Sequence, residues 1–547
     1  MQQISIAWID YVVIALYFGA VLSIGWYLKK FTRTGEDFFL AGRRNSAWVA
    51  GLAFLAANMG AVELMGMAGA SYEYGMLTGH FYWFGAIPAM LFLGLFMMPF
   101  YYSSRIHSVP GYLKLRFDER NRTLNAISFA IMTLLVSGIN LYAMALTLYT
   151  IIGWEFNFCI WISAMTVAIY VTLGGLTSAI FNEIIQFFLI WFGLLLLSIM
   201  GIIDIGGWDQ ILARIPDSYK HLWGTTGDPA NNPMVINWLG LSLGLGFVLG
   251  FGYWTTDFLV VQRVFSSRDL RTAQNAPIIA TFFKMAIPLI VIVTGLIGIS
   301  ILPKLGPGTN YTYDAVLPLL IARYYPPGLM GLGVTALLAG FMSGQAGNIS
   351  AFNTVWTYDI YRSHINKNAS DEHYVRMGRI CTIVGVLISI ITAYWVMKFP
   401  SIMDYMQAIF SWVNAPLFAT ILLGMFWKRT TSAGAFWGLL LGMLSSFTMF
   451  ILVRYEIISV SSIAFTHLAS QMAANFWRAW WAWVITFGST ITISLFTTPK
   501  PVEELKGLVW GLTKMEKQLI PVPWFRNPWF WAVISLIIYF ILNILYW

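Results

Sequence analysis

Three ionisable side chains lie inside long apolar stretches of this chain: Glu63, Glu183 and Lys284. Hydrocarbon supplies no hydrogen-bond partners, so a charged group at membrane depth must be paired or must line a wet cavity. Such groups bind ions and polar solutes or carry protons. Two of them also have simpler explanations: Glu183 begins its apolar run and fits the membrane interface, and Lys284 lies close enough to a span end for its ammonium to reach the headgroups.

The stretch 48–75 is poorly suited to a continuous lipid-facing helix, because Asn58, Gly60 and Glu63 lie in the middle of an otherwise apolar run. A helix that unwinds near 57–60 accommodates these residues, since its free carbonyls and side chains then line a polar cavity. Secondary transporters bind ion and substrate at discontinuous helices of this kind. The alternative is a continuous helix buried against other helices, with Glu63 protonated or paired.

Two further stretches carry polar groups at membrane depth. The stretch 329–360 is rich in small and polar residues, Ser343 among them, and must be surrounded by protein or water. Sodium is a hard cation that takes several oxygen ligands. We expect carbonyls of Ala56, Met59 and Ala339 and the hydroxyl of Ser343 to supply most of them. Gln407 opens another apolar run, where a hydrogen bond to a neighbouring helix explains it.

The composition fits a polytopic membrane protein. Of the 547 residues, 58% are hydrophobic and 10% charged, against roughly 25% charged in soluble domains. The net charge of +8 does not indicate nucleic acid, because the charges lie in loops. The two cysteines and six histidines are scattered and show no disulfide framework, metal-ligand spacing or nucleophile–base pair. We therefore expect no enzyme and no required protein partner.

Apolar runs of about 20 residues predict membrane-spanning helices. Fourteen are expected, near 8–28, 48–73, 79–102, 124–152, 156–173, 178–205, 236–260, 276–302, 329–360, 380–398, 403–427, 432–453, 476–497 and 528–547. Most of the 32 Lys and Arg fall in one alternate set of loops. The positive-inside rule then places both termini outside an inner (plasma) membrane.

The order of these spans predicts an inverted repeat. We expect a second break near Gly250, in the glycine-rich span 236–260. This span comes five spans after the first broken span and therefore crosses the membrane in the opposite direction. Two five-span units of opposite topology, 48–205 and 236–427, would hold substrate between them. The span 8–28 precedes them, and three helices in 432–547 follow, so that residues 1–547 form one transporter domain.

Several blocks resemble the sodium/solute symporter family, most closely its sodium–glucose cotransporter branch. They are WIDYVVIALYF at 8–18, AANMGA at 56–61, LGGLTSAIFNEIIQ at 173–186, YWTTDFLVVQR at 253–263, FNTVWTYDIY at 352–361, DYMQAIFSWVNAP at 404–416 and FWKRTTSAGAFWGLLLG at 426–442. The resemblance covers essentially the whole chain. It implies an all-α membrane fold of the leucine-transporter type and coupled import of a small polar, sugar-like solute by alternating access.

The resemblance also assigns a solute site, with departures. Asn58, Lys284 and Gln407 match the family's sugar-contacting positions, and Tyr253 matches its inner-gate aromatic residue. Three positions differ: Glu63 stands where the family has Gln or His, Tyr82 where the sugar transporters have Glu, and Gly250 where they have a polar side chain. Glu63 would favour an amine-bearing ligand or form an ion pair with Lys284.

The coupling ion implied is Na⁺, at a weakened site. The family's main sodium site uses carbonyls at Ala56, Met59 and Ala339 and two consecutive hydroxyls, which here are Ser343 and Gly344. One hydroxyl is therefore missing. Glu183 falls where relatives carry an intramembrane Asp implicated in cation coupling. Coupling to protons, uncoupled transport and a solute sensor remain alternatives.

Overall fold

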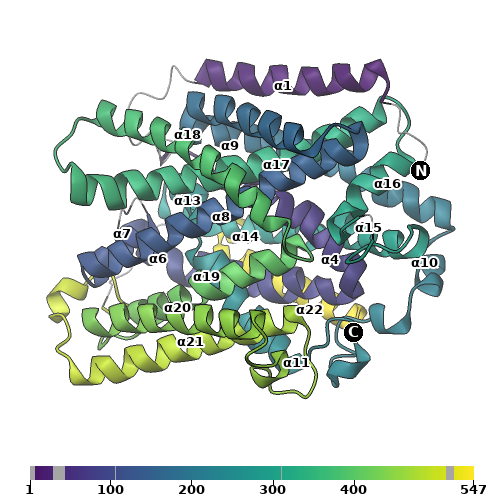
Figure 1. The fold of residues 1–547 in the computed structure, drawn as a ribbon. Helices are drawn as coiled ribbons and strands as arrows, with labels where there is room; N and C mark the ends of the chain where they lie inside the picture. The colour runs from purple at the N-terminus through teal and green to yellow at the C-terminus, as the bar shows by residue number, and fades with distance from the viewer. Residues whose placement is uncertain (1–5, 29–42, 105, 107, 310, 513–522) are drawn as a thin grey trace.

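A computed structural model describes residues 6–28, 43–104, 106, 108–309, 311–512 and 523–547 (Figure 1). Every element of those residues is a helix, apart from a single β-bridge between Asn45 and Ser267. Within the described residues, eleven helical stretches are long and apolar enough to cross a membrane, and three shorter apolar helices accompany them. The predicted all-α, multi-pass architecture is confirmed, whereas the count of fourteen separate spans is not reproduced.

The helices that border the two breaks or pack around them, and the long helices at the edges, follow in chain order. Their bounds are α1 Trp8–Leu28, α3 Ala47–Asn58, α4 Met67–Tyr74, α8 Glu119–Ile152, α9 Phe156–Ile205, α12 Phe251–Thr256, α13 Phe258–Phe265, α14 Leu270–Ala286, α15 Pro288–Ile301, α17 Leu329–Thr354, α18 Asp371–Val396, α19 Ile402–Phe426, α20 Ser432–Arg454, α21 Gln471–Phe496 and α22 Pro528–Leu545.

The difference in span number arises where predicted spans join. Helix α9 runs without interruption through the expected boundary between 156–173 and 178–205. Glycines lower helix stability by roughly 1 kcal/mol each but do not end a helix by themselves, and the pair Gly174–Gly175 lies within α9. The expected boundary near 73–79 is present, because α4 ends at Tyr74 and Gly75 has a positive φ of 64°, although helical turns resume directly and continue to Tyr102.

Helix α17 lies at the centre of the molecule. It packs against α1, α3, α8, α9 and α18 (Figure 1), and its residues from Val334 to Thr354 are all buried. Helices α20 and α21 pack side by side at one edge, and α1 lies along the opposite edge. A helix with so many small and polar side chains needs protein on all sides, as the sequence predicted.

The first helix break lies where the sequence predicted it. Helix α3 ends at Asn58, and a π-helical turn η3 begins only at Val62. Between them the backbone N–H of Met59 donates to Ala56 (3.0 Å), and that of Gly60 donates to Asn58 (2.8 Å). The N–H of Met59 also keeps its helical bond to Leu55 (3.2 Å), so the regular hydrogen-bond ladder is interrupted at Gly60 and Ala61, in the middle of the apolar run.

The second break lies in the predicted span but not at the predicted residue. Residues 241–250 form a π-helical segment, η9, that continues directly into α12. The interruption comes at Asp257, whose extended backbone (φ −71°, ψ 115°) separates α12 from α13. Its carboxylate accepts a hydrogen bond from the backbone N–H of Leu259 at 2.9 Å and so caps the start of α13.

Backbone pairing joins the two discontinuous helices. The N–H of Asn45 donates to Ser266 at 3.1 Å, and the N–H of Arg268 donates to Asn45 at 3.1 Å. The side-chain amide of Asn45 also donates to the Ser266 hydroxyl at 2.9 Å. The start of α3 and the end of α13 are thus held together by three hydrogen bonds.

Glycine at position 250 serves packing. A Cβ there would lie 2.9 Å from the Cα and carbonyl carbon of Gly85. We expect Gly250→Ala to lower the free energy of unfolding by about 1–3 kcal/mol, as overpacking does, measured by thermal unfolding in detergent. Gly488→Ala is the matched control, because a Cβ there meets nothing within 4 Å. Equal melting temperatures for Gly250→Ala and wild type would contradict the close packing.

Candidate functional site

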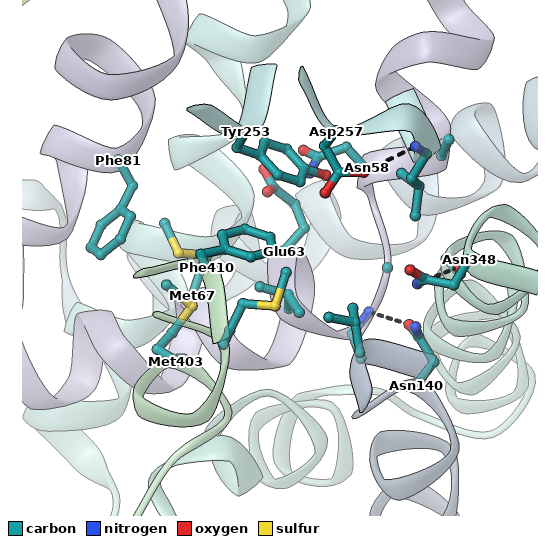
Figure 2. A pocket seen from close by; sticks show the side chains of 18 of the residues that line it. Asn58, Glu63, Met67, Phe81, Asn140, Tyr253, Asp257, Asn348, Met403 and Phe410 are labelled. Carbon is teal, nitrogen blue, oxygen red and sulfur yellow. Dashed lines mark hydrogen bonds between the residues drawn. The ribbon is translucent and has the colours of Figure 1, made fainter. Parts of the chain in front are cut away.

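A cavity of about 100 Å³ lies where the two broken helices approach each other (Figure 2). Eight parts of the chain contribute to its wall: the α3–η3 break, the start of α4, the π-helical turn at 80–86, α8, the α12–α13 break, α14, α17 and α19. Its polar side chains are Asn58, Glu63, Asn140, Asp257, Lys284, Asn348 and Gln407. Tyr82, Tyr253, Trp254 and Phe410 supply aromatic surface.

Lys284 points into this cavity and not towards the membrane surface. Its side chain is 3% exposed, and its Nζ donates to Glu63 Oε1 at 2.6 Å and to Asn58 Oδ1 at 2.7 Å. The ammonium also lies 4.8 Å from the centre of the Tyr82 ring and 4.9 Å from that of Trp254. Such cation–π contacts strengthen in desolvated sites. The ion pair between Glu63 and Lys284, one of the two alternatives for Glu63, is thus formed.

The network extends to the aromatic residue expected at the gate. The Asn58 amide donates to the Tyr253 hydroxyl at 2.8 Å. The Tyr253 ring stacks on Phe410, with centroids 5.0 Å apart and planes inclined by 26°. Gln407 lines the same cavity, and its Oε1 has no hydrogen-bond partner among the described residues. An unpartnered buried acceptor is available for a hydroxyl of a bound solute.

The expected sodium ligands lie where α17 meets the first break. The Ser343 hydroxyl donates to the Ala56 carbonyl at 3.0 Å. This carbonyl also accepts from Met59, so the expectation that it is free is wrong. Both of its lone pairs are used, and a cation bound there would replace the hydrogen bond from Ser343, whose hydroxyl would then turn its oxygen towards the ion. The Met59 carbonyl oxygen lies 2.9 Å from the place of a Cβ on Gly340. Ala339 and Ser343 are fully buried on α17.

Glu183 lies outside the cavity. It forms an ion pair with Arg263 of α13, and both side chains are fully buried. Arg263 also donates to the carbonyl of Leu259 at 2.9 Å. The pair joins α9 to the helix that follows the second break, and protein encloses both side chains.

The residues that line the cavity differ in part from those predicted from the sequence. Gly250 packs on Gly85 and does not line the cavity. Trp254, Asp257 and Asn140 do line it. The available signal was the same one that identified Glu63: a polar group within an apolar run, here Asn140 between Ile139 and Leu141.

This arrangement agrees with what comparison of the chain with known proteins finds. The family described as the sodium:solute symporter family matches residues 38–442. The chain belongs to this family. The resemblance seen in its sequence blocks is therefore confirmed, and membership makes the protein a sodium-coupled solute symporter of the membrane.

Known relatives and a solved structure are similar over most of the chain. A sodium/glucose cotransporter of Vibrio parahaemolyticus is 27% identical over 79% of this chain and 83% of its own length. Human sodium/glucose cotransporter 4 is 27% identical over 93% of this chain and 80% of its own. The substrate-bound, outward-open structure of a Na⁺-coupled sialic acid symporter covers 90% of this chain and 99% of its own, with 21% identity and a TM-score of 0.74. The fold is thus that of a known symporter.

Proposed function

We propose that this protein imports a small polar, sugar-like solute together with Na⁺ by alternating access. The observation that carries the proposal is the network Tyr253–Asn58–Lys284–Glu63, which joins three helices at a helix break inside an otherwise apolar protein. Relatives named as glucose cotransporters and a sialic acid symporter support a polyhydroxylated solute.

The charges of the site favour an uncharged solute. Glu63 neutralises Lys284 at 2.6 Å, so an amine or a carboxylate on the ligand would have to compete with an existing partner. Hydroxyl groups need no such exchange, because they accept from Lys284 and Asn58 and donate to Gln407. Tyr82 and Tyr253 offer aromatic faces for the apolar face of a sugar ring.

Sodium is proposed to bind at the first break, next to the solute. Carbonyls of Ala56, Met59 and Ala339 and the hydroxyl of Ser343 form the ligand set, and Gly344 supplies no side-chain oxygen. Met59 directly follows Asn58, which contacts the solute network. Sodium and solute would therefore both favour the same conformation of the segment at Asn58 and Met59. Their binding free energies are then linked reciprocally.

The wider architecture belongs to the same proposal. Residues 48–205 and 236–427 are proposed as the two inverted units, with both termini outside the plasma membrane. Glu183 is proposed as the ion-coupling position, acting through its pair with Arg263 beside the second break.

Uptake into proteoliposomes tests the proposal. A panel of labelled sugars and amines is offered with an inward sodium gradient, with a proton gradient and with neither. We expect sodium-stimulated uptake of an uncharged sugar. Stimulation by protons alone, uptake that needs no gradient, or binding without uptake would instead favour a proton-coupled carrier, an uncoupled carrier or a sensor.

Gln407→Ala tests the solute site separately. We expect about five- to tenfold slower uptake at low solute concentration, because loss of a buried hydrogen bond costs on the order of 1 kcal/mol and about 1.4 kcal/mol corresponds to tenfold. Gln186→Ala is the control, since Gln186 is buried and bonded to Tyr17 away from the cavity. Equal uptake by the two variants would remove Gln407 from the solute site.

A further inference from the structure

Asn140 of α8 reaches the first helix break. Its side chain is 2% exposed, and its Oδ1 accepts a hydrogen bond from the backbone N–H of Ala61 at 3.0 Å. That N–H belongs to the interrupted segment and has no place in the α3 ladder. Figure 2 shows the Asn140 amide directed at this segment, on the side where α17 passes.

The same oxygen lies beside the position that lacks a hydroxyl. A Cβ on Gly344 would lie 2.6 Å from Asn140 Oδ1 and 2.8 Å from the Cα of Gly60. A side chain at residue 344 would therefore enter the space that the Asn140 oxygen takes. Because residue 344 is glycine, the side-chain amide of Asn140 from α8 can occupy the space that a hydroxyl-bearing side chain of α17 would otherwise fill.

We propose that Asn140 Oδ1 is a ligand of the transported sodium ion and replaces the oxygen that Gly344 does not provide. The inference rests on the proposed sodium site at the first break. An amide oxygen has two lone pairs, and Ala61 uses one of them. Amide and peptide carbonyls are ligands that hard cations accept. Sodium would then bind α8 together with the α3 break and α17, and the site would not be weakened.

Sodium-dependent thermal stability of the purified protein tests this assignment without requiring transport, because a ligand that binds the folded state raises its melting temperature. Melting temperatures are measured against NaCl, with choline chloride keeping the ionic strength constant. We expect Asn140→Leu to raise the half-saturating sodium concentration at least about tenfold. Asn140→Asp should lower it, since a carboxylate attracts the cation more strongly than an amide.

Asn125→Leu is the matched control. Asn125 lies on the same helix, is 1% exposed and does not line the cavity. It should leave the half-saturating sodium concentration unchanged, whatever happens to its melting temperature without sodium. A purely structural role of Asn140 would likewise change only the sodium-free melting temperature.

Separate outcomes distinguish the two proposals. If sodium does not stabilise the wild type, the sodium site itself is wrong. If sodium stabilises the wild type and Asn140→Leu with the same half-saturating concentration, the assignment of Asn140 is overturned. Should Asn140→Leu fail to fold, an unchanged half-saturating concentration in Asn140→Asp overturns it. Gly344→Ser should weaken sodium binding because its Cβ meets Asn140 and Gly60; tighter binding would also overturn the assignment.

Discussion

Replacing Lys284 by alanine is expected to abolish solute uptake, with a loss of at least about 100-fold, and to destabilise the protein. The substitution leaves the Glu63 carboxylate, 5% exposed, without its cation, and the Asn58 oxygen without its donor. Breaking one partner of a buried ion pair costs about 3–5 kcal/mol. Uptake into proteoliposomes and the melting temperature in detergent measure the two effects.

Two variants separate these effects. Glu63→Gln introduces the residue type that the family resemblance leads one to expect and keeps an acceptor for Lys284. It should transport, with an altered preference among the solutes of the panel. Lys284→Met combined with Glu63→Gln removes both charges and should melt above Lys284→Ala while still failing to transport. Normal uptake by a well-inserted Lys284→Ala would remove the solute site proposed here.

Replacing Arg263 by methionine is expected to cause the second largest effect, on stability. Its guanidinium and the Glu183 carboxylate are both fully buried and bonded to each other. The single substitution leaves a carboxylate uncompensated at membrane depth, so we expect a loss of about 3–5 kcal/mol. Reversible unfolding in a denaturing detergent measures it.

The double variant is the decisive comparison. Arg263→Met with Glu183→Leu removes both charges and should recover most of the lost stability, because two well-packed apolar side chains often replace a buried ion pair at little cost. Lys220→Ala, which removes a solvent-exposed pair with Asp217, should change nothing measurable. A double variant as unstable as Arg263→Met would show that the guanidinium stabilises the protein through other contacts, such as that to Leu259.

The first break and its ion pair were predictable because they depend on local chemistry. Asn58 and Glu63 are unsuited to a continuous lipid-facing helix, and Lys284 is the only Lys or Arg deep within a predicted span. The second break was placed wrongly because many glycines suggested a flexible Gly250. The chain instead breaks where Asp257 caps a new helix, and the glycines admit close packing.

Other features depend on which distant residues meet. Nothing in the sequence pairs Glu183 with Arg263 or brings Asn140 to Gly344, since each pair joins helices far apart in the chain. From the sequence alone, Gly344 therefore indicated only that one sodium ligand is missing. The cation–π contact of Trp254 was likewise not predictable, because it depends on the position of Lys284 on α14.

The pairing of Asn45 with Ser266 and Arg268 has a mechanical consequence. It ties the start of α3 to the end of α13, the ends that lie away from the two breaks, so we expect these two segments to move together. We then expect rotation during opening and closing of the cavity to occur at Gly60–Ala61 and at Asp257, where regular helical hydrogen bonds are interrupted. The proposed ion and solute sites lie at those same interruptions.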